Sequence, residues 1–164
     1  MIGHRSYIAS WWRNQCQPKL VIRLRREGHQ VYDFRNPPSG SGGFSWREID
    51  GDWESWNTAS YRNALWHPKA EAGYKDDMDA LTTAQIVVLL LPSGRSAHVE
   101  AGYFRGIGGI VVVHISQLSE PELMYKMFNS ITETDDELVT LLSKPLPELR
   151  ALNMSQLAIT VGKA

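Results

Sequence analysis

The sequence predicts an α/β fold in which a five-stranded parallel sheet lies between two layers of helices. Two apolar runs, 86–91 and 110–114, have the composition of strands that are buried on both faces. Shorter strand patterns occur at 7–9, at 31–34 and near 131, and stretches of helical periodicity separate the strands. Because strands that alternate with helices form parallel sheets covered on both sides, we expect a three-layer sandwich with strand order 2-1-3-4-5.

The connecting segments indicate where the elements begin and end. Pro18 and Gly28 bracket the first helix, which has leucine and valine at helical spacing. Two prolines, 37 and 38, end the second strand, and the glycine- and serine-rich residues 39–43 predict a mobile loop. Tryptophan and isoleucine at helical spacing predict a helix that begins near Trp46 and is broken by His67-Pro68. Further helices are expected at 68–84, 97–105, 122–129 and 135–142, whereas the residues after Pro145 show no clear pattern.

Length, composition and charge restrict the class of protein. The chain has 164 residues, of which 43% are hydrophobic, a single cysteine and a formal net charge of −1. This size predicts one soluble domain over 1–164, with a core that needs no disulfide. The near-neutral charge argues against nucleic-acid binding, which requires a cationic surface. With neither an apolar leader nor a run long enough to span a membrane, a cytoplasmic protein without membrane contact is expected.

The strand order predicts where a ligand would bind. In open parallel sheets, ligands bind beyond the carboxyl ends of the strands, at the point where the strand order reverses. For the order 2-1-3-4-5 this point lies between the first and third strands. Three segments are expected to converge there: 10–14, 33–36 and 92–100.

The segment 93–100, SGRSAHVE, leads from an apolar strand into a helix. Its glycine-containing turn would leave backbone N–H groups available for an anion or a sugar oxygen. Glu100 is expected in the first helical turn, where the helix dipole favours an ionised, nucleophilic carboxylate. The spacing is equally compatible with a structural role, in which Ser96 caps the helix and Glu100 complements its dipole.

Three aspartates, Asp76, Asp77 and Asp79, precede the third strand. One explanation is a solvated acidic face on a helix. The other is that one of these carboxylates and Glu100 form the acid and nucleophile pair of a retaining glycoside cleavage.

Aromatic residues supply further candidates, because all six tryptophans lie in the first 66 residues. Trp53 and Trp56 fit packing positions, whereas Trp11, Trp12 and Trp46 lie in or beside loops and are candidates for stacking on a flat base. The sequence contains neither a Walker phosphate loop nor a GxGxxG motif, and its five histidines lack zinc-type spacing. These observations argue against a kinase or classical dinucleotide site, and no metal is expected.

Taken together, several segments resemble the nucleoside 2-deoxyribosyltransferase superfamily. They are 7–14, 31–37 and above all 87–103, VVLLLPSGRSAHVEAGY, while 122–125 is similar to the bacterial and phage branch. The resemblance covers about residues 5–143. It implies a flavodoxin-like, Rossmann-like domain that cleaves the N-glycosidic bond of 2′-deoxynucleosides or their 5′-monophosphates. The implied reaction forms a covalent glycosyl-glutamate, transfers the sugar to another base and uses no cofactor.

The resemblance also implies roles for individual residues. Glu100 matches the nucleophile, and Tyr7 matches the tyrosine that orients it. Asp77 matches the aspartate that holds the sugar or protonates the departing base, and Asp79 is close enough to compete for that role. The residues expected to bind the substrate are Ser10, Trp11, Trp12, Arg13, Asp33, Arg35, Asn36, Trp46, Ser93, Gly94, Arg95, Ser96 and His98.

Two departures from the family pattern leave alternatives open. Ser10 stands where the family often has glycine, and Gln85 replaces an aspartate, which would remove a charge near the expected site. With water as the acceptor, the chain would be a deoxynucleoside 5′-monophosphate N-glycosidase. A NAD-type glycohydrolase and a non-catalytic nucleotide-sensing module are further alternatives. Members of the family commonly form homodimers or larger homo-oligomers, and the tail 144–164 is the candidate subunit contact.

Overall fold

The computed structural model describes residues 2–40, 42–117 and 120–154. The chain divides into two compact units, which are treated separately below. The sheet unit comprises residues 1–32 and 83–164, and the helical unit comprises Asp33–Thr82. No helix in the described part of the chain is both long and apolar enough to cross a membrane.

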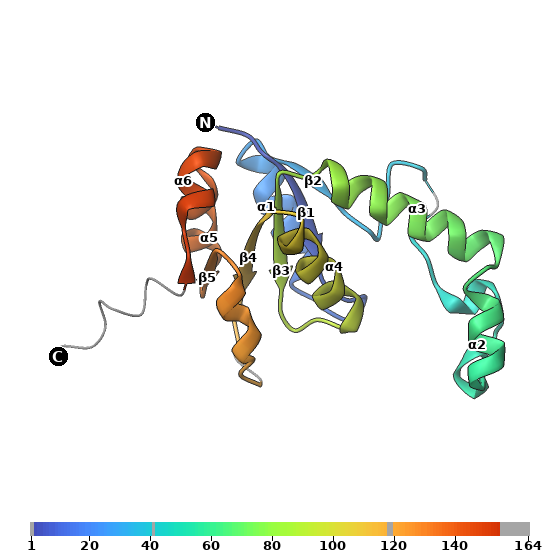
Figure 1. Ribbon diagram of the computed structural model, residues 1–164. Coiled ribbons are helices and arrows are strands. Elements are labelled where there is room, and N and C mark those ends of the chain that lie inside the picture. Colours follow the sequence, from blue (N-terminus) through green and yellow to red (C-terminus); the bar gives the residue numbers. More distant parts are fainter. Residues whose placement is uncertain (1, 41, 118–119, 155–164) are drawn as a thin grey trace. The chain divides into compact units, whose positions relative to one another are not determined.

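The sheet unit contains the parallel sheet that the sequence predicts, with strand order β2-β1-β3-β4-β5 (Figure 1). The two central apolar strands are buried at every residue. This burial explains why neither strand alternates between apolar and polar residues. The strands are β1 (Arg5–Ala9), β2 (Gln30–Tyr32), β3 (Ile86–Leu90), β4 (Ile110–His114) and β5 (Ser130–Thr132).

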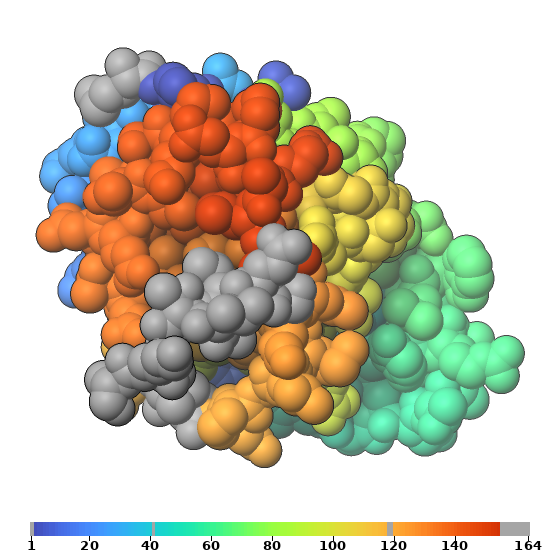
Figure 2. All heavy atoms as spheres, turned by 60° about the vertical axis from the view of Figure 1, so that its left-hand side comes forward, coloured from blue at the N-terminus to red at the C-terminus, as the bar shows by residue number. Residues whose placement is uncertain are grey.

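Helices cover both faces of this sheet. On one face, α1 (Gln17–Arg26), α5 (Asp135–Leu142) and α6 (Leu146–Ala151) bury leucines against Ile8, Val88 and Val112. Figure 2 shows α5 and α6 from outside, side by side. On the other face, α4 (Arg95–Gly106) packs against β1, β3 and β4 through small and aromatic residues, including Ala97 and Phe104. The predicted three-layer arrangement is therefore confirmed.

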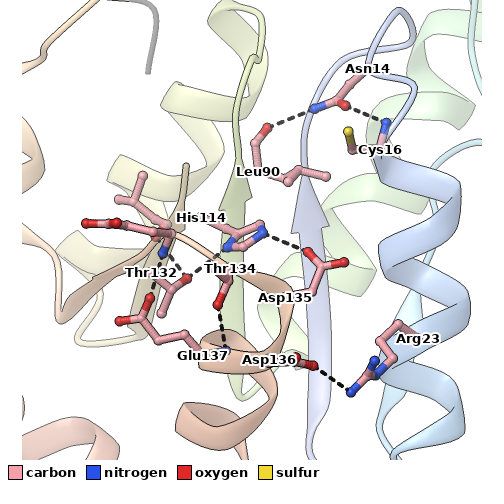
Figure 3. A network of polar contacts seen from close by, with 12 residues as sticks. Asn14, Cys16, Arg23, Leu90, His114, Thr132, Thr134, Asp135, Asp136 and Glu137 are labelled. Atoms are coloured by element: carbon pink, nitrogen blue, oxygen red, sulfur yellow. Dashed lines mark hydrogen bonds and ion pairs between the residues drawn. The ribbon is translucent and has the colours of Figure 1, made fainter. Parts of the chain in front are cut away.

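A polar network joins the last two strands to α5 (Figure 3). His114 is fully buried, and its Nδ1 lies 2.9 Å from Thr132 Oγ1 and its Nε2 lies 3.0 Å from Asp135 Oδ1. Thr134 caps α5 by accepting a hydrogen bond from the backbone N–H of Glu137 at 3.1 Å. Both ring nitrogens of His114 therefore stabilise the fold.

Several element boundaries differ from the sequence predictions. The second strand ends at Tyr32, because Asp33 folds into a turn in which Asn36 N–H donates to its carbonyl at 2.9 Å. The fourth helix begins at Arg95, two residues before the expected start at Ala97. The predicted helix over 122–129 is a 3₁₀-helix, η3 (Leu123–Met127), and the unassigned tail contains α6.

The helical unit contains α2 (Thr58–Ala64) and α3 (Pro68–Thr83), the latter extending one residue into the sheet unit. The single helix predicted from Trp46 to His67-Pro68 is wrong in its first half, where two 3₁₀ turns, η1 (Trp46–Glu48) and η2 (Trp53–Ser55), form instead, and α2 occupies its second half. Asp50 and Asp52 lie between these turns, and Asp50 Oδ1 accepts from the Asp52 N–H at 2.9 Å. Such local side-chain acceptors compete with helical hydrogen bonds.

Candidate functional site

The carboxyl ends of β1 and β3 are joined by one buried amide side chain. Asn14 Nδ2 donates to the carbonyl of Pro92 at 3.0 Å and to Ser10 Oγ at 3.1 Å, and it lies 3.5 Å from the Leu90 carbonyl. Its Oδ1 accepts from the N–H of Cys16 at 2.9 Å (Figure 3). The amide therefore fixes the β1–α1 loop beside the end of β3, the position at which the strand order reverses.

Ser10 takes part in this junction. Its hydroxyl donates to the Leu90 carbonyl at 3.0 Å and accepts from Asn14. A glycine at position 10 would lack this bond between β1 and β3. Asn14 lies in the segment 10–14 that was predicted to reach the site, but the sequence analysis assigned it no role. The signal that would have identified it is an amide side chain at the end of a strand-to-helix loop, where backbone donors and acceptors lack partners.

The β3–α4 turn lies next to the β1–α1 loop. Gly94 is the N-cap of α4, and a Cβ at this position would lie 3.7 Å from Trp11 Cβ. Trp11 and Trp12 are 36% and 48% exposed, and the Arg13 guanidinium lies 5.7 Å from the Trp11 ring centroid. This loop therefore presents exposed aromatic surface and positive charge beside the first turn of α4.

The early start of α4 corrects two expectations. Because Gly94 is the N-cap, Ser96 is the second helical residue and does not cap the helix. Glu100 is the sixth helical residue and lies in the second turn, not in the first. The effect of the helix dipole falls off within the first turn, so it contributes less to the ionisation of Glu100 than the sequence suggested.

Glu100 and Tyr7 come from elements on the same side of the sheet. Ile8 belongs to the core beneath α1 and α5, so strand alternation places the side chain of Tyr7 on the face covered by α4. Tyr7 is buried and stacks on Tyr32 with ring centroids 5.2 Å apart. Glu100 is half-buried and directly precedes Ala101, one of the α4 residues that contact the sheet.

The other residues expected in the turn are also located there. Ser93 and Gly94 precede α4, and Arg95, Ser96 and His98 lie in its first turns. Arg95 and Ser96 are exposed, whereas His98 is half-buried and bonded to a tyrosine of η3. The sheet unit therefore brings together residues 7–13 and 93–100.

The remaining candidates belong to the helical unit. Asp33 Oδ1 accepts from the Arg35 N–H at 3.1 Å, and its Oδ2 accepts from Asn36 Nδ2 at 2.9 Å, so the three residues form one turn. Trp46 lies at the centre of an aromatic cluster, with ring centroids 4.8 Å from Phe44, 5.7 Å from Trp56 and 5.8 Å from Tyr61. Trp46 therefore packs within the helical unit.

The three aspartates of α3 have different surroundings. Asp79 is exposed and forms an ion pair with Lys75 one helical turn earlier. Asp76 accepts a hydrogen bond from Ser39 Oγ at 2.7 Å. Asp77 is half-buried and takes part in neither of these interactions. Among the residues that the structure describes, no group of three His, Cys, Asp or Glu side chains could hold a metal ion.

Gln85 lies at the end of β3 opposite to the β3–α4 turn. It precedes β3, and its Oε1 accepts from the Arg5 N–H at 2.9 Å at the amino edge of the sheet. The five residues of β3 separate it from the carboxyl edge by about 17 Å at ~3.3 Å per residue.

Comparison with known proteins gives structural matches. No protein-family model matches the sequence, and no curated protein matches it. A 2-deoxyribosyltransferase from Bacillus psychrosaccharolyticus is 19% identical, with a TM-score of 0.52 over 88% of this chain and 94% of that one. A CMP N-glycosidase from Clostridium botulinum is 14% identical, with a TM-score of 0.47 over 85% of this chain and 98% of that one.

At these identities the likeness concerns the fold, which agrees with the resemblance found in the sequence. The strand order and the two helical layers are those expected from it. By its architecture, the chain is similar to the 2-deoxyribosyltransferase of Bacillus psychrosaccharolyticus.

Proposed function

We propose that the protein cleaves the N-glycosidic bond of 2′-deoxynucleosides or their 5′-monophosphates and transfers the sugar to another base. The observation that supports this most directly is the placement of Glu100. The residue lies on the helix that follows the strand-order reversal, and this helix covers the sheet face to which Tyr7 belongs. A half-buried carboxylate in this position suits attack on a sugar carbon.

The proposed reaction has two displacements. In the first, a carboxylate oxygen of Glu100 bonds to the anomeric carbon and the carbon–nitrogen bond breaks, so that the electron pair leaves with the base. Asp77 donates a proton to that base or holds the sugar. In the second, a nitrogen of the incoming base attacks the same carbon, the carbon–oxygen bond to Glu100 breaks to release the carboxylate, and the proton of that nitrogen passes to the Asp77 carboxylate left by the first step. Tyr7 orients the nucleophile.

The surroundings of the turn suit a nucleoside. Trp11 and Trp12 offer flat, exposed surface on which a base can stack. Arg13, Arg95 and Ser96 are exposed donors beside the turn and suit sugar oxygens or a 5′-phosphate. In this proposal Asp33, Arg35 and Asn36 contribute from the turn that begins the helical unit.

We also propose that the protein is a homo-oligomer in which α4 and η3 form the contact. Arg105 Nε donates to the Met127 carbonyl at 2.7 Å, so the two elements are neighbours. Six of their large apolar residues are between 44% and 74% exposed, and apolar surface gathered on two neighbouring elements is typical of a subunit interface. They are Val99, Tyr103, Ile107, Leu123, Met124 and Met127.

The α4–η3 surface, defined by these six side chains, also suits contact with a second copy of itself. Gly102 and Gly106 lie on α4, and a Cβ at either position would meet open space. Projecting apolar side chains and adjacent gaps on one helix are compatible with a two-fold contact. The described part of the tail instead packs on its own chain, because Leu149 is fully buried and Leu146 and Leu152 contact the core. Residues 155–164 of the tail lie outside the described residues.

The function is tested by mass spectrometry of the products. Wild type, Glu100→Gln and the control Glu148→Gln, an exposed glutamate of α6, are each incubated with deoxynucleosides, their 5′-monophosphates, NAD and an acceptor base. We expect an exchanged nucleoside from wild type and control and none from Glu100→Gln. Full activity of Glu100→Gln would overturn the assignment of the nucleophile.

The same experiment distinguishes the alternative functions. Free base together with free sugar or sugar phosphate would identify a hydrolase, and nicotinamide released from NAD alone would identify a NAD glycohydrolase. Ligand-dependent thermal stabilisation without any product over several hours would favour a sensing module.

A further inference from the structure

A chain of hydrogen bonds joins η3 to the beginning of α4. The Tyr125 hydroxyl lies 2.8 Å from His98 Nε2, and His98 Nδ1 lies 2.9 Å from the carbonyl oxygen of Gly94. Ser93 Oγ lies 3.4 Å from the same Nδ1. The two rings are nearly parallel, with their planes 17° apart. Residues that are 27 positions apart in the sequence are thereby linked at the N-cap of the helix that carries Glu100.

The chemistry of these groups determines the position of the protons. A carbonyl oxygen can only accept, so the contact with Gly94 requires the hydrogen on His98 Nδ1. In the neutral ring Nε2 then has a lone pair, and the Tyr125 hydroxyl donates to it. Burial and the nearby Glu122 carboxylate raise the pKa of Tyr125, which keeps the phenol protonated and able to donate. Donors and acceptors are therefore matched along the whole chain.

These bonds add to the restraint that the buried Ala97 already gives the first turn of α4. Gly94 has no side chain with which to cap the helix, and Arg95 and Ser96 are exposed. Tyr125, by contrast, is only 7% exposed and stacks on Phe128, so it is a rigid anchor. Because His98 is bonded to both Tyr125 and Gly94, its imidazole restricts the motion of the turn.

We propose that Tyr125 and His98 are positioning residues, which hold the first turn of α4 and thereby the Glu100 carboxylate in the geometry required for attack. This inference rests on the proposed function. It changes the role of His98, which the family resemblance led us to expect among the residues that bind the substrate. Since both ring nitrogens are engaged within the protein, the neutral ring has no hydrogen left to offer a phosphate.

A small cavity adjoins this pair and provides the competing explanation. It has a volume of about 200 Å³ and is lined by Ser93, His98 and Tyr125 together with Glu120 and Glu122. If the substrate entered this cavity and contacted His98, substitutions there would weaken substrate binding. A positioning role predicts instead that they slow the chemical step while binding is retained.

Steady-state kinetics with the deoxynucleoside that wild type turns over separates the two roles. We expect Tyr125→Phe and His98→Gln to lower kcat about tenfold with KM changed less than twofold. His98→Asn can still donate an amide N–H to Gly94, but it loses the bond to Tyr125, so we expect it to lower kcat to the same extent as Tyr125→Phe. Tyr74→Phe, at an exposed tyrosine of α3, is the control and should match wild type. A rise in KM at constant kcat, or wild-type kinetics in Tyr125→Phe, would overturn the proposal.

A second measurement remains valid if the proposed reaction itself fails. The ¹⁵N spectrum of wild-type His98 should show the Nδ1–H tautomer, and amide hydrogen exchange at residues 95–98 should be faster in Tyr125→Phe than in wild type or Tyr74→Phe. The Nε2–H tautomer, or unchanged exchange, would refute the positioning role. Absence of turnover by wild type, with these two signatures present, would refute only the proposed reaction.

Discussion

Asn14 Nδ2 lies 3.0 Å from the carbonyl oxygen of Pro92, and this contact joins the loop after β1 to the loop after β3. The side chain is 3% exposed, so water cannot replace the bond. Both loops contain residues of the candidate site, and the Asn14 amide helps to hold the two loops next to each other. The contact therefore relates the stability of the fold to the geometry of the site.

We predict that Asn14→Asp destabilises the protein more than Asn14→Ala. Alanine removes the donor to the Pro92 carbonyl and the acceptor of the Cys16 N–H, and a buried group left unsatisfied costs about 1–3 kcal/mol. Aspartate adds a buried negative charge that faces the carbonyl oxygens of Leu90 and Pro92, so its cost is larger. Urea unfolding followed by circular dichroism measures both. Equal midpoints for the two variants would show that the amide donors contribute little.

Asp77 and Asp79 are expected to respond differently to substitution by asparagine. Asp77→Asn should lower kcat by 10²–10⁴-fold if Asp77 protonates the departing base, the usual contribution of a general acid. Asp79→Asn removes an exposed ion pair with Lys75, a kind of contact that contributes little to stability, and should leave activity intact. Product formation from a deoxynucleoside measures both, and the reverse pattern would assign the acid to Asp79.

The buried His29 predicts a loss of stability in mild acid. Burial, and secondarily the neighbouring His4, lower the pKa of His29, so the folded state favours the neutral ring. In the unfolded chain the imidazole takes up a proton near pH 6.5. The contribution of His29 to the free energy of unfolding is therefore fully present above that pH and declines as the pH falls below it. His29→Asn keeps an acceptor for the His4 N–H, which now donates to His29 Nδ1 at 3.2 Å, and should flatten this decline.

Urea midpoints between pH 7.5 and pH 5 test the contribution of His29. The matched control is His67→Asn, because His67 Nδ1 likewise accepts from a backbone N–H, that of Lys69, at 3.2 Å. The control should retain the wild-type dependence on pH. If His29→Asn lost stability as steeply as wild type, another group would have to be responsible.

The α4–η3 surface predicts the effect of a charge on assembly. Tyr103→Lys should lower the mass measured by light scattering after size-exclusion chromatography to that of one chain, because a desolvated lysine opposes burial. Ile22→Lys is the control, since Ile22 of α1 is similarly exposed, at 52%, but lies on the opposite helical layer. A monomeric wild type at micromolar concentration would contradict the proposed contact.

A substitution at position 85 tests whether a charge at the amino edge of the sheet affects catalysis. Gln85→Glu restores a charge of the kind found in the resembling family and keeps an oxygen that can accept from the Arg5 N–H. Because Gln85 lies at the amino edge of the sheet, we expect kcat/KM within twofold of wild type for every substrate. A changed substrate preference would mean that this edge influences the site.

The sequence by itself determined the architecture. The runs 86–90 and 110–114 are apolar at nearly every residue, and this composition alone indicates strands covered on both faces. Helical periodicity and proline positions located α1, α3 and α5 within one or two residues, because these signals are local. The alternation of the elements predicted a parallel sheet, and the expected strand order, which the structure has, indicated the edge at which to look for a site.

Only the tertiary structure decided the details on which the chemistry depends. The start of α4 at Arg95 moved Glu100 out of the first turn, and the position of Gln85 at the amino edge depends on pairing between β1 and β3. Trp46 was predicted beside a loop, but it is surrounded by aromatic rings from elsewhere in the helical unit. The contact between Tyr125 and His98 joins residues 27 positions apart. Periodicity reports on neighbours along the chain, whereas these contacts depend on how the elements pack in space.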